Sequence, residues 1–513
     1  MSSVNPNWPP PDPRYHFKQH QPSRAAYVFA IVLPLILIAL LAVPVGIVLG
    51  LRSNAQMGPG TQSSGTEADG APGVGDPYFP DAGSSGYDVS KYEISISWDP
   101  ASQTIKATTR IAARSTQLLE SFYLDLALQI DRVQVEGQKA TFEKQDFQDV
   151  QVIPAEPIAA NSEFEVAVDY SGAPGEISRG KVQPWFSSGQ EWTVVGEPES
   201  AAWWFPSNDH PSDPALMDIS VRVPTGLQVI SIGRLESQDA DNEADFDTWH
   251  WVSRQPIPTY TAFVTIGRYQ IEQGVADSRP YIYAVSMQLS PENRKKAMTQ
   301  LRKTTGTVRV LEQMFGPYPF TETGGVVPAH RFAFGGMETQ TRPVYNPRSI
   351  LNDAYAPVLI THELAHMWFG DNVTLRQWDD IFNNEAYASW AQWGFAERTG
   401  GRPASAALNS AYERTEGEPR FWQVTMIDPG PGQLFSTVYI RGPMTLQALR
   451  NVIGDDAFFR LARDWSQRPG ARSLEEWMAA AQAQTTVDLQ PFFEAWIYGS
   501  TAPARTAENG FRE

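Results

Sequence analysis

The apolar residues of this chain follow three different patterns along its length. The first is a continuous run: residues 25–51 contain no charged side chain, and Arg52 follows directly after the run. At 1.5 Å per helical residue, such a run exceeds the roughly 30 Å hydrocarbon core of a bilayer. The apolar core of a cleaved signal peptide usually spans only about 7–15 residues, so residues 25–51 predict an uncleaved transmembrane helix.

The second pattern is an alternation of apolar and polar residues at period two, which is typical of half-buried strands. It begins near residue 92 and recurs, separated by turn residues, as far as residue 266. The runs cover residues 92–98, 105–111, 122–128, 164–170, 219–223, 229–232 and 260–266. We therefore expect an antiparallel β-domain over residues 76–270.

The third pattern, beyond about residue 287, has the apolar spacing of helices. The expected helices cover residues 291–315, 354–369, 380–398, 442–453, 456–465, 474–483 and 489–498. They predict a mainly helical domain over residues 271–500, followed by a C-terminal tail over residues 501–513. The predicted fold class is thus α+β and multidomain, with a β-domain preceding a helical domain and a single transmembrane helix preceding both.

Two segments of biased composition flank the apolar run. Residues 1–24 are rich in Pro, Asn and His and predict a disordered tail, whereas the Gly-, Pro- and Ser-rich residues 52–75 predict a flexible stalk. Three basic residues and one acidic residue precede the run, while acidic residues dominate soon after Arg52. The positive-inside rule then predicts a single-pass protein of the cell membrane, with a cytoplasmic N-terminus and an extracellular catalytic domain.

Composition narrows the possible functions. Of the 513 residues, 42% are hydrophobic, as is usual in packed globular proteins. The formal net charge of −18 argues against a nucleic-acid partner, because binding to nucleic acid needs a basic surface. The chain has no cysteine, so a metal site can use only histidine and carboxylate ligands.

The strongest chemical signal is the stretch His-Glu-Leu-Ala-His at residues 362–366. His362 and His366 are four residues apart, which on a helix puts both imidazoles on one face, as two ligands of one metal ion require. Glu363 between them can reach a water molecule that the metal activates. If the motif were purely structural, two imidazoles and a carboxylate would lie in an apolar helix without a metal ion, where unpaired polar groups are costly. The motif predicts a Zn²⁺ site.

Tetrahedral zinc in an enzyme needs a third protein ligand besides an exchangeable water. Glu385 lies among apolar and aromatic residues, an expensive place for a carboxylate that is neither paired nor metal-bound. Asp379 and Asp380 are alternatives, but they lie near a predicted helix start, where acidic residues often serve as caps. Spacing alone leaves this choice open. The isolated His210 and His330 are expected to form structural hydrogen bonds rather than bind metal.

The order of these residues resembles the gluzincin aminopeptidases of the M1 family, which includes aminopeptidase N. The resembling segments are the metal motif with Glu385 after eighteen further residues, Trp-Phe-Gly at 368–370, Phe-Gly-Gly-Met-Glu-Thr at 334–339, Val-Tyr-Ile-Arg-Gly at 438–442, and the segment 197–206. Four positions depart from the family pattern: Gly336 replaces Ala, Thr339 replaces Asn, Val195 replaces Gln and Ala202 replaces Arg. The likeness covers roughly residues 76–500, so we expect a short form without the C-terminal helical domain of larger members.

The resemblance implies a thermolysin-like catalytic domain with one Zn²⁺ per chain, bound by His362, His366 and Glu385. It implies that Glu363 acts first as general base and then as general acid. It also implies that Tyr439 donates a hydrogen bond to the oxyanion of the tetrahedral intermediate.

For the substrate, the resemblance implies recognition of a free α-ammonium group. Glu338 is the main candidate, beside the backbone of Gly335, Gly336 and Met337, and Glu197 contributes from the β-domain. The apolar neighbours of Glu338 indicate an edge strand that lines a pocket rather than a loop in solvent.

Together these inferences predict a membrane-tethered zinc metallo-aminopeptidase that hydrolyses the N-terminal peptide bond of peptides by zinc-activated water. A thermolysin-like endopeptidase is an alternative, although that family has its third ligand one residue later, where this chain has Ala386. A non-catalytic ectodomain that binds peptides is a further alternative, although Glu363 and Tyr439 are both present.

Overall fold

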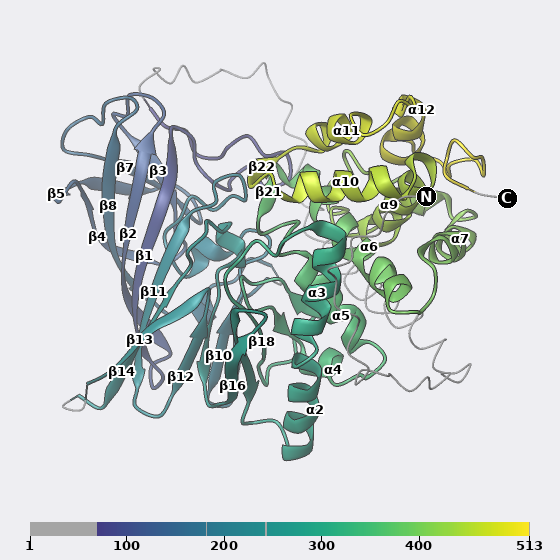
Figure 1. Cartoon of the computed structure of the whole chain (residues 1–513). Helices are drawn as coiled ribbons and strands as arrows, with labels where there is room; N and C mark the ends of the chain where they lie inside the picture. Colours follow the sequence, from purple (N-terminus) through teal and green to yellow (C-terminus); the bar gives the residue numbers. More distant parts are fainter. Residues whose placement is uncertain (1–68, 181, 242–243, 512–513) are drawn as a thin grey trace.

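The computed structural model describes residues 69–180, 182–241 and 244–511 (Figure 1). The predicted tail (1–24), the predicted anchor (25–51) and most of the predicted stalk lie outside these ranges. Within them, no helix combines the length and the apolar character that crossing a membrane requires.

The first half of the described chain is built from three sheets. The largest has eight strands, in spatial order β13 (Arg234–Asp241), β14 (Phe246–Val252), β11 (Leu216–Pro224), β1 (Tyr87–Asp99), β2 (Thr104–Ser115), β8 (Glu163–Gly172), β4 (Gln129–Val135) and β5 (Gln138–Lys139). A four-stranded sheet has the order β12 (Gln228–Ser231), β15 (Val264–Gly267), β10 (Glu191–Val194) and β9 (Trp185–Ser188). A three-stranded sheet contains β3 (Phe122–Asp125), β7 (Asp149–Ile153) and β6 (Thr141–Lys144).

Buried and more exposed side chains alternate along the strands, and the buried ones pack between the sheets. In β1 the side chains of Tyr92, Ile94, Ile96 and Trp98 are buried while those between them are more exposed. This face shares one apolar core with residues of the four-stranded sheet, so the period-two pattern in the sequence reflects a β-sandwich. One pair departs from the predicted antiparallel arrangement: β1 runs parallel to β11, which the long connection between them permits.

One predicted strand begins later than expected. Residues Thr259–Thr261 form a 3-10 turn, and β15 starts only at Val264. Pro258, which has no amide hydrogen, precedes this turn. The buried Tyr260 therefore lies in the turn, between the β-domain and the helical half, instead of in a strand.

The second half contains a smaller sheet and most of the helices, which lie on the opposite side of Figure 1 from the large sheet. The sheet has the order β16 (Tyr269–Ala276), β17 (Arg279–Ser286), β18 (Thr323–Val327), β20 (Val344–Tyr345) and β19 (Gly336–Met337), and β21 (Val373–Leu375) pairs with β22 (Gly470–Arg472). The helices are α2 (Pro291–Leu301), α3 (Thr304–Phe315), α4 (Pro347–Ile350), α5 (Ala356–Ala365), α6 (Phe382–Arg398), α7 (Ala404–Thr415), α8 (Pro419–Trp422), α9 (Val438–Ile453), α10 (Asp455–Ser466), α11 (Leu474–Gln482) and α12 (Gln490–Phe493). The order of a β-domain followed by a mainly helical domain confirms the predicted α+β class.

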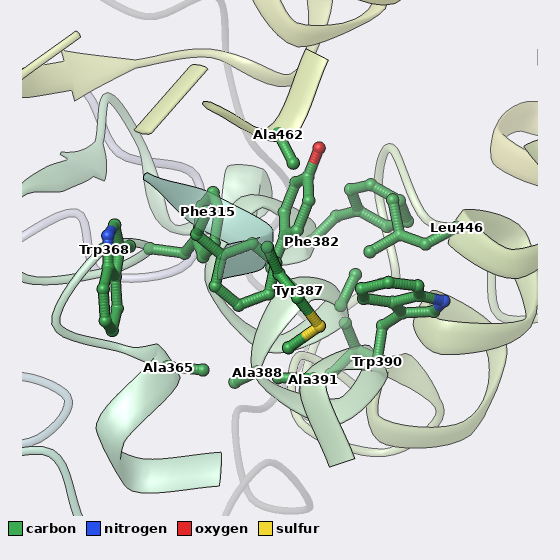
Figure 2. Packing of buried hydrophobic residues seen from close by; sticks show 14 of the residues in the cluster. Phe315, Ala365, Trp368, Phe382, Tyr387, Ala388, Trp390, Ala391, Leu446 and Ala462 are labelled. Atoms are coloured by element: carbon green, nitrogen blue, oxygen red, sulfur yellow. The ribbon is translucent and has the colours of Figure 1, made fainter. Parts of the chain in front are cut away.

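Helix α6 contacts the helices α3, α5, α7, α9 and α11, and Figure 2 shows part of this packing from close by. Its residues Phe382, Tyr387 and Trp390 are fully buried and pack with Phe315 of α3 and Leu446 of α9. Because an apolar core surrounds α6, the polar residues that it carries near its start are held in fixed positions.

Both ends of the described chain pack against the fold. The amide of Gly70 donates to the Ser121 carbonyl at 2.9 Å. Residues 69–75, which composition assigned to the stalk, therefore pack against the β-domain. At the other end, within the predicted tail, the Phe511 ring is buried 4.6 Å from the Tyr412 ring of α7.

Candidate metal centre and active site

Helix α5 and its first following residue bring the two histidines together. His362 lies in the last turn of α5 and His366 caps its C-terminus. Their Nε2 atoms are 3.3 Å apart, and Oε2 of Glu385, from α6, lies 3.3 Å from the first and 3.5 Å from the second. Tetrahedral zinc with bonds of about 2.0–2.1 Å separates its ligand atoms by about 3.3 Å. The three donors therefore fit Zn²⁺.

The outer contact of His366 supports metal binding through Nε2, and that of His362 depends on the orientation of an amide. Nδ1 of His366 lies 3.1 Å from the Phe369 carbonyl oxygen, which can only accept, so the proton is on Nδ1 and Nε2 is free. Nδ1 of His362 lies 2.9 Å from Nε2 of Gln392, an amide nitrogen that exchanges its position with the amide oxygen when the group is turned by 180°. Metal binding by His362 requires that the amide oxygen of Gln392 accept from Nδ1–H.

The charges at the centre favour a bound cation. Burial acts to raise the pKa of Glu385, but His366 and His362 outweigh it and lower that pKa to about 2. Burial acts to lower the pKa of His366, but Glu338 and Glu385 raise it well above its ordinary value. The carboxylates thus draw positive charge to the Nε2 atom of His366, and a metal ion bound there would supply that charge in place of a proton.

Glu363 points to the same place from the neighbouring position on α5. It is 4% exposed, and burial, with Glu338 and Glu385 nearby, raises its pKa well above the ordinary value. The strand β19 approaches it closely: a Cβ atom on Gly336 would lie 2.5 Å from Oε1 of Glu363. Only glycine leaves room for this contact without a shift.

The predicted oxyanion donor lies beside the third ligand. Tyr439 is the second residue of α9, and its hydroxyl donates to Oε1 of Glu385 at 3.1 Å. Its ring lies 6.0 Å from that of His362. Among eighteen tyrosines in the chain, this one is thus placed at the metal centre.

The two predicted amine-binding carboxylates converge on this centre from different domains. Carboxylate atoms of Glu338 and Glu363 and a ring nitrogen of His366 lie within 4.8 Å of one another. Oε1 of Glu338 is buried and has no hydrogen-bond partner among the described residues. Glu197 follows β10 of the β-domain, and its pKa is raised well above the ordinary value by burial and by the charges of Glu338 and Glu385.

The segment Gly335, Gly336 and Met337 forms the rim of the site. β19 pairs with β20 only, so it is the edge of its sheet among the described strands. Met337 is buried, while the backbone of the two glycines lies along α5, where a Cβ on Gly335 would be 3.2 Å from Leu359. This arrangement matches the predicted edge strand.

The remaining candidates lie elsewhere. Asp380 caps the 3-10 helix η5 (Trp378–Ile381), accepting from the Gln377 amide at 3.1 Å and the Leu474 amide at 2.6 Å. It is therefore occupied as a cap and is not among the groups that could share a metal ion. His330 contacts the Ser187 carbonyl at 3.3 Å.

Comparison with known proteins agrees with this geometry. Residues 89–261 match the peptidase M1 N-terminal domain, and residues 299–496 match the peptidase family M1 domain. The chain belongs to peptidase family M1. The zinc metallopeptidases of this family that it resembles imply a zinc cofactor, for which His362, His366 and Glu385 are the fitting donors.

Several named proteins are similar in sequence to this M1 peptidase. A leucyl aminopeptidase of Saccharolobus solfataricus is 23% identical over 441 residues, which cover 80% of this chain and 53% of the relative. A probable aminopeptidase 2 of Sulfurisphaera tokodaii is 26% identical over 313 residues, covering 59% and 38%. The chain thus spans about half, or less, of the length of these relatives.

A solved structure matches over nearly its full length. The M1 zinc metallopeptidase of Deinococcus radiodurans superposes with a TM-score of 0.75 and 25% identity, covering 84% of this chain and 98% of that one. A variant of that protein with bound Tyr-Ser-Ala substrate superposes with a TM-score of 0.74 at 25% identity, over 84% and 99% of the two chains.

Two residues near the centre of this M1 peptidase were missed by sequence reasoning. Gln392 lies seven residues after Glu385, two turns along the same face of α6, and that spacing was the available signal. Tyr260 is fully buried, and its hydroxyl accepts from Nδ2 of Asn384 at 3.3 Å. No local pattern connects Tyr260 with a helix more than a hundred residues later.

Proposed function

We propose that this protein is a zinc aminopeptidase that hydrolyses the N-terminal peptide bond of peptides. One observation carries the proposal: the three fitting zinc donors share a buried site with Glu338, whose Oε1 has no partner among the described residues, and with the charge of Glu197. A hydrolytic centre beside a buried carboxylate oxygen of Glu338 that has no partner in the described part of the chain, and near the second carboxylate of Glu197, suits a substrate with a positive charge next to the scissile bond.

The chemistry at the scissile bond divides among a few residues. Zinc bound by His362, His366 and Glu385 would polarise the scissile carbonyl and acidify the attacking water. Glu363, buried beside the ligands on the same helix, accepts the proton of that water and passes it to the leaving nitrogen. The Tyr439 hydroxyl donates to the carbonyl oxygen as negative charge develops there.

Recognition of the substrate's end follows from charge. An α-ammonium group beside Glu338 and Glu197 would relieve the repulsion that, together with burial, raises the pKa of Glu197. The peptide backbone that follows can lie along the free edge of β19, as extended peptides do at exposed sheet edges. Bound in this way, the first peptide bond lies at the metal centre. The names of the aminopeptidase relatives support the same reading.

The membrane tether is the second part of the proposal. The uncharged residues 25–51 would anchor the chain, and the basic residues before them would keep the N-terminus in the cytoplasm. The substrates would then be peptides outside the cell. Fractionation with a protease-protection assay tests this part: digestion of the C-terminal domain on intact cells is expected, and its protection would contradict the topology.

The activity is tested with leucyl p-nitroanilide and its N-acetylated form, using the full chain in detergent. The unmutated protein should cleave the free-amine substrate at least about 100-fold faster, because the acetylated one has no cation for Glu338 and Glu197. Glu363→Gln should keep zinc but lose about 10²–10⁴-fold in kcat.

Other outcomes identify the alternatives. Cleavage of acetylated internal peptide bonds at a comparable rate would indicate an endopeptidase. Binding of zinc and peptides without any cleavage would indicate a non-catalytic ectodomain.

A further inference from the structure

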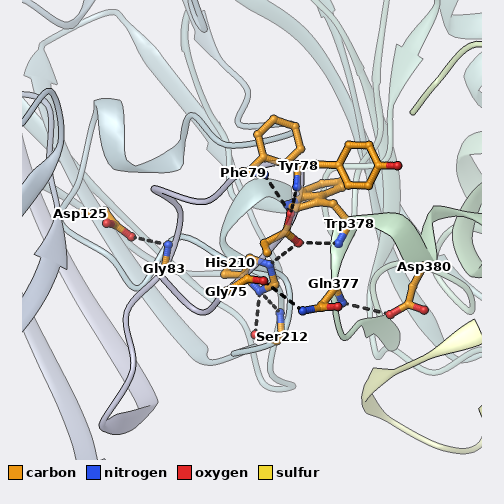
Figure 3. Close-up of polar contacts among 11 residues, drawn as sticks. Gly75, Tyr78, Phe79, Gly83, Asp125, His210, Ser212, Gln377, Trp378 and Asp380 are labelled. Atoms are coloured by element: carbon orange, nitrogen blue, oxygen red, sulfur yellow. Dashed lines mark hydrogen bonds and ion pairs between the residues drawn. The ribbon is translucent and has the colours of Figure 1, made fainter. Parts of the chain in front are cut away.

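The short segment Gly75–Phe79 lies between the two halves of the protein. Asp76 is 1% exposed, and its two carboxylate oxygens accept hydrogen bonds from three different parts of the chain. Figure 3 shows Tyr78, Phe79, His210 and Trp378 gathered around this point. We call residues Asp76–Phe79 the clasp.

The first two bonds shape the clasp itself, and the others join it to both domains. Oδ1 of Asp76 accepts from the amides of Tyr78 and Phe79 at 2.8 and 2.9 Å. Oδ2 accepts from Nε2 of His210, in the β-domain, at 3.1 Å and from the amide of Trp378, in the helical half, at 2.7 Å. One carboxylate therefore ties the two halves together.

The His210 ring is oriented for this role. Its Nδ1 accepts from the Ser212 amide at 3.2 Å, so Nε2 carries the hydrogen that Asp76 accepts. Burial acts to raise the pKa of Asp76, but the bond from His210 and the three amide bonds outweigh it and lower the pKa below its ordinary value. The carboxylate is thus held in its charged, accepting form.

The bond to Trp378 leads directly to the third zinc ligand. Trp378 is the first residue of η5, which continues without a break into α6, where Glu385 is the fourth residue. The Trp378 ring lies 5.4 Å from that of Phe79 and 5.6 Å from that of Tyr260. The clasp therefore fixes the start of the helix that presents Glu385.

A second branch leads to the predicted oxyanion donor. The Tyr78 hydroxyl donates to Asp428 and accepts from the Gly430 amide at 2.8 Å. These residues belong to the loop that precedes α9, whose second residue is Tyr439. Phe435 of the same loop packs 6.3 Å from the Trp378 ring.

From these contacts we infer that the clasp positions the active site: Asp76 acts through Trp378 on Glu385, and Tyr78 acts through the loop 428–437 on Tyr439. Neither residue touches the reacting atoms, so both are positioning residues. The inference rests on the proposed function for its kinetic part, whereas its zinc part stands on the metal centre alone.

Asp76→Asn tests the first branch, with the exposed Asp88→Asn as a control for loss of charge near the same end of the chain. An amide offers one acceptor oxygen instead of two, so it cannot hold both the clasp amides and the amide of Trp378. We expect the zinc dissociation constant, measured by chelator competition, to rise about tenfold, the low end of the range found when groups that directly contact metal ligands are changed. kcat per zinc-loaded site should fall while KM changes little, and Asp88→Asn should match the unmutated protein.

Tyr78→Phe tests the second branch and remains informative if Asp76→Asn does not fold. Loss of the hydroxyl should lower kcat about three- to tenfold, the equivalent of one hydrogen bond, with zinc affinity unchanged. A fall in melting temperature alone, with zinc affinity, kcat and KM unchanged well below that temperature in both variants, would overturn the inference. Inactivity of the unmutated protein would instead reject the proposed function, and the zinc measurement would still decide the first branch.

Discussion

At the scale of single residues, the two zinc-binding histidines have neutral groups as the hydrogen-bond partners of their Nδ1 atoms. The Nδ1 atom of His366 meets a backbone carbonyl, and that of His362 meets the amide of Gln392. A neutral acceptor orients an imidazole but makes it less basic than a carboxylate does. Among the described groups, Gln392 is thus a point at which zinc affinity can be tuned from outside the ligand set.

The first prediction concerns Gln392. Gln392→Leu removes the acceptor and should weaken zinc binding about 10–100-fold, whereas Gln392→Glu should tighten it, because a carboxylate raises the basicity of His362. The measurement is chelator competition at equilibrium, with Gln423→Leu, an exposed site, as the control. Equal zinc affinity in all four proteins would show that Gln392 does not orient His362.

At the scale of elements, the central packing of α6 sets the positions of both α5 and α9. Gly442 of α9 lies so close to α6 that a Cβ atom there would be 2.8 Å from the Cβ of Ala386. Gly306 of α3 is exposed, and a Cβ there would meet nothing within 4 Å. The two glycines are in helices, but only one of them is needed for packing.

These surroundings predict opposite effects of the same substitution. Gly306→Ala should stabilise the protein by about 0.5–1 kcal/mol, since alanine is the better helix former. Gly442→Ala should destabilise it by about 1–3 kcal/mol through overpacking and lower kcat, because α9 carries Tyr439. Urea unfolding of both variants measures the difference, and a shift of the same sign in both would refute the packing argument.

The elements also show what the sequence could reveal. The strands of the large sheet and the helix of His362 follow from their periodicity. The start of α9 at Val438, four residues before the predicted start at residue 442, could not be predicted from periodicity. The close contact of α9 with α6 keeps Pro443 inside the helix. Helix α7 (Ala404–Thr415) was not predicted, and the predicted helix 291–315 is divided into α2 and α3.

The candidate site shows the same division. The predicted residues 362, 363, 366, 385 and 439 lie at one centre, and resemblance to a family, rather than spacing, chose Glu385 over Asp379 and Asp380. The contacts of Tyr260 and Asp76 depend on tertiary structure across more than a hundred residues. No local pattern encodes such contacts.

At the scale of the whole molecule, stability should depend on pH through buried carboxyl groups away from the metal. Burial raises the pKa of Asp380 from 3.8 to about 7, although amides of Leu474 and Gln377 oppose this. A raised folded-state pKa means that the folded state holds its proton more tightly than the unfolded state. The contribution of Asp380 to stability is therefore complete below pH 3.8 and is lost as the pH rises toward 7.

Asp380→Asn should remove this dependence. The free energy of unfolding of the unmutated protein should fall, relative to that of the variant, by a few kcal/mol between pH 4.5 and pH 7.5, roughly what such a shift allows. Urea unfolding at the two pH values provides the comparison. An unchanged difference between the two proteins would contradict it, whatever the variant's absolute stability.

The bond between Asp76 and Trp378 joins residues 302 positions apart. A ribosome adding about 5–20 residues per second needs roughly 15–60 s to travel that distance. Asp76 thus leaves the ribosome long before the amide that it accepts from, while the β-domain that holds His210 is already complete in sequence. The bond from the Trp378 amide can form only after that residue has been made, so Asp76 stays without this partner through the synthesis of the intervening 301 residues.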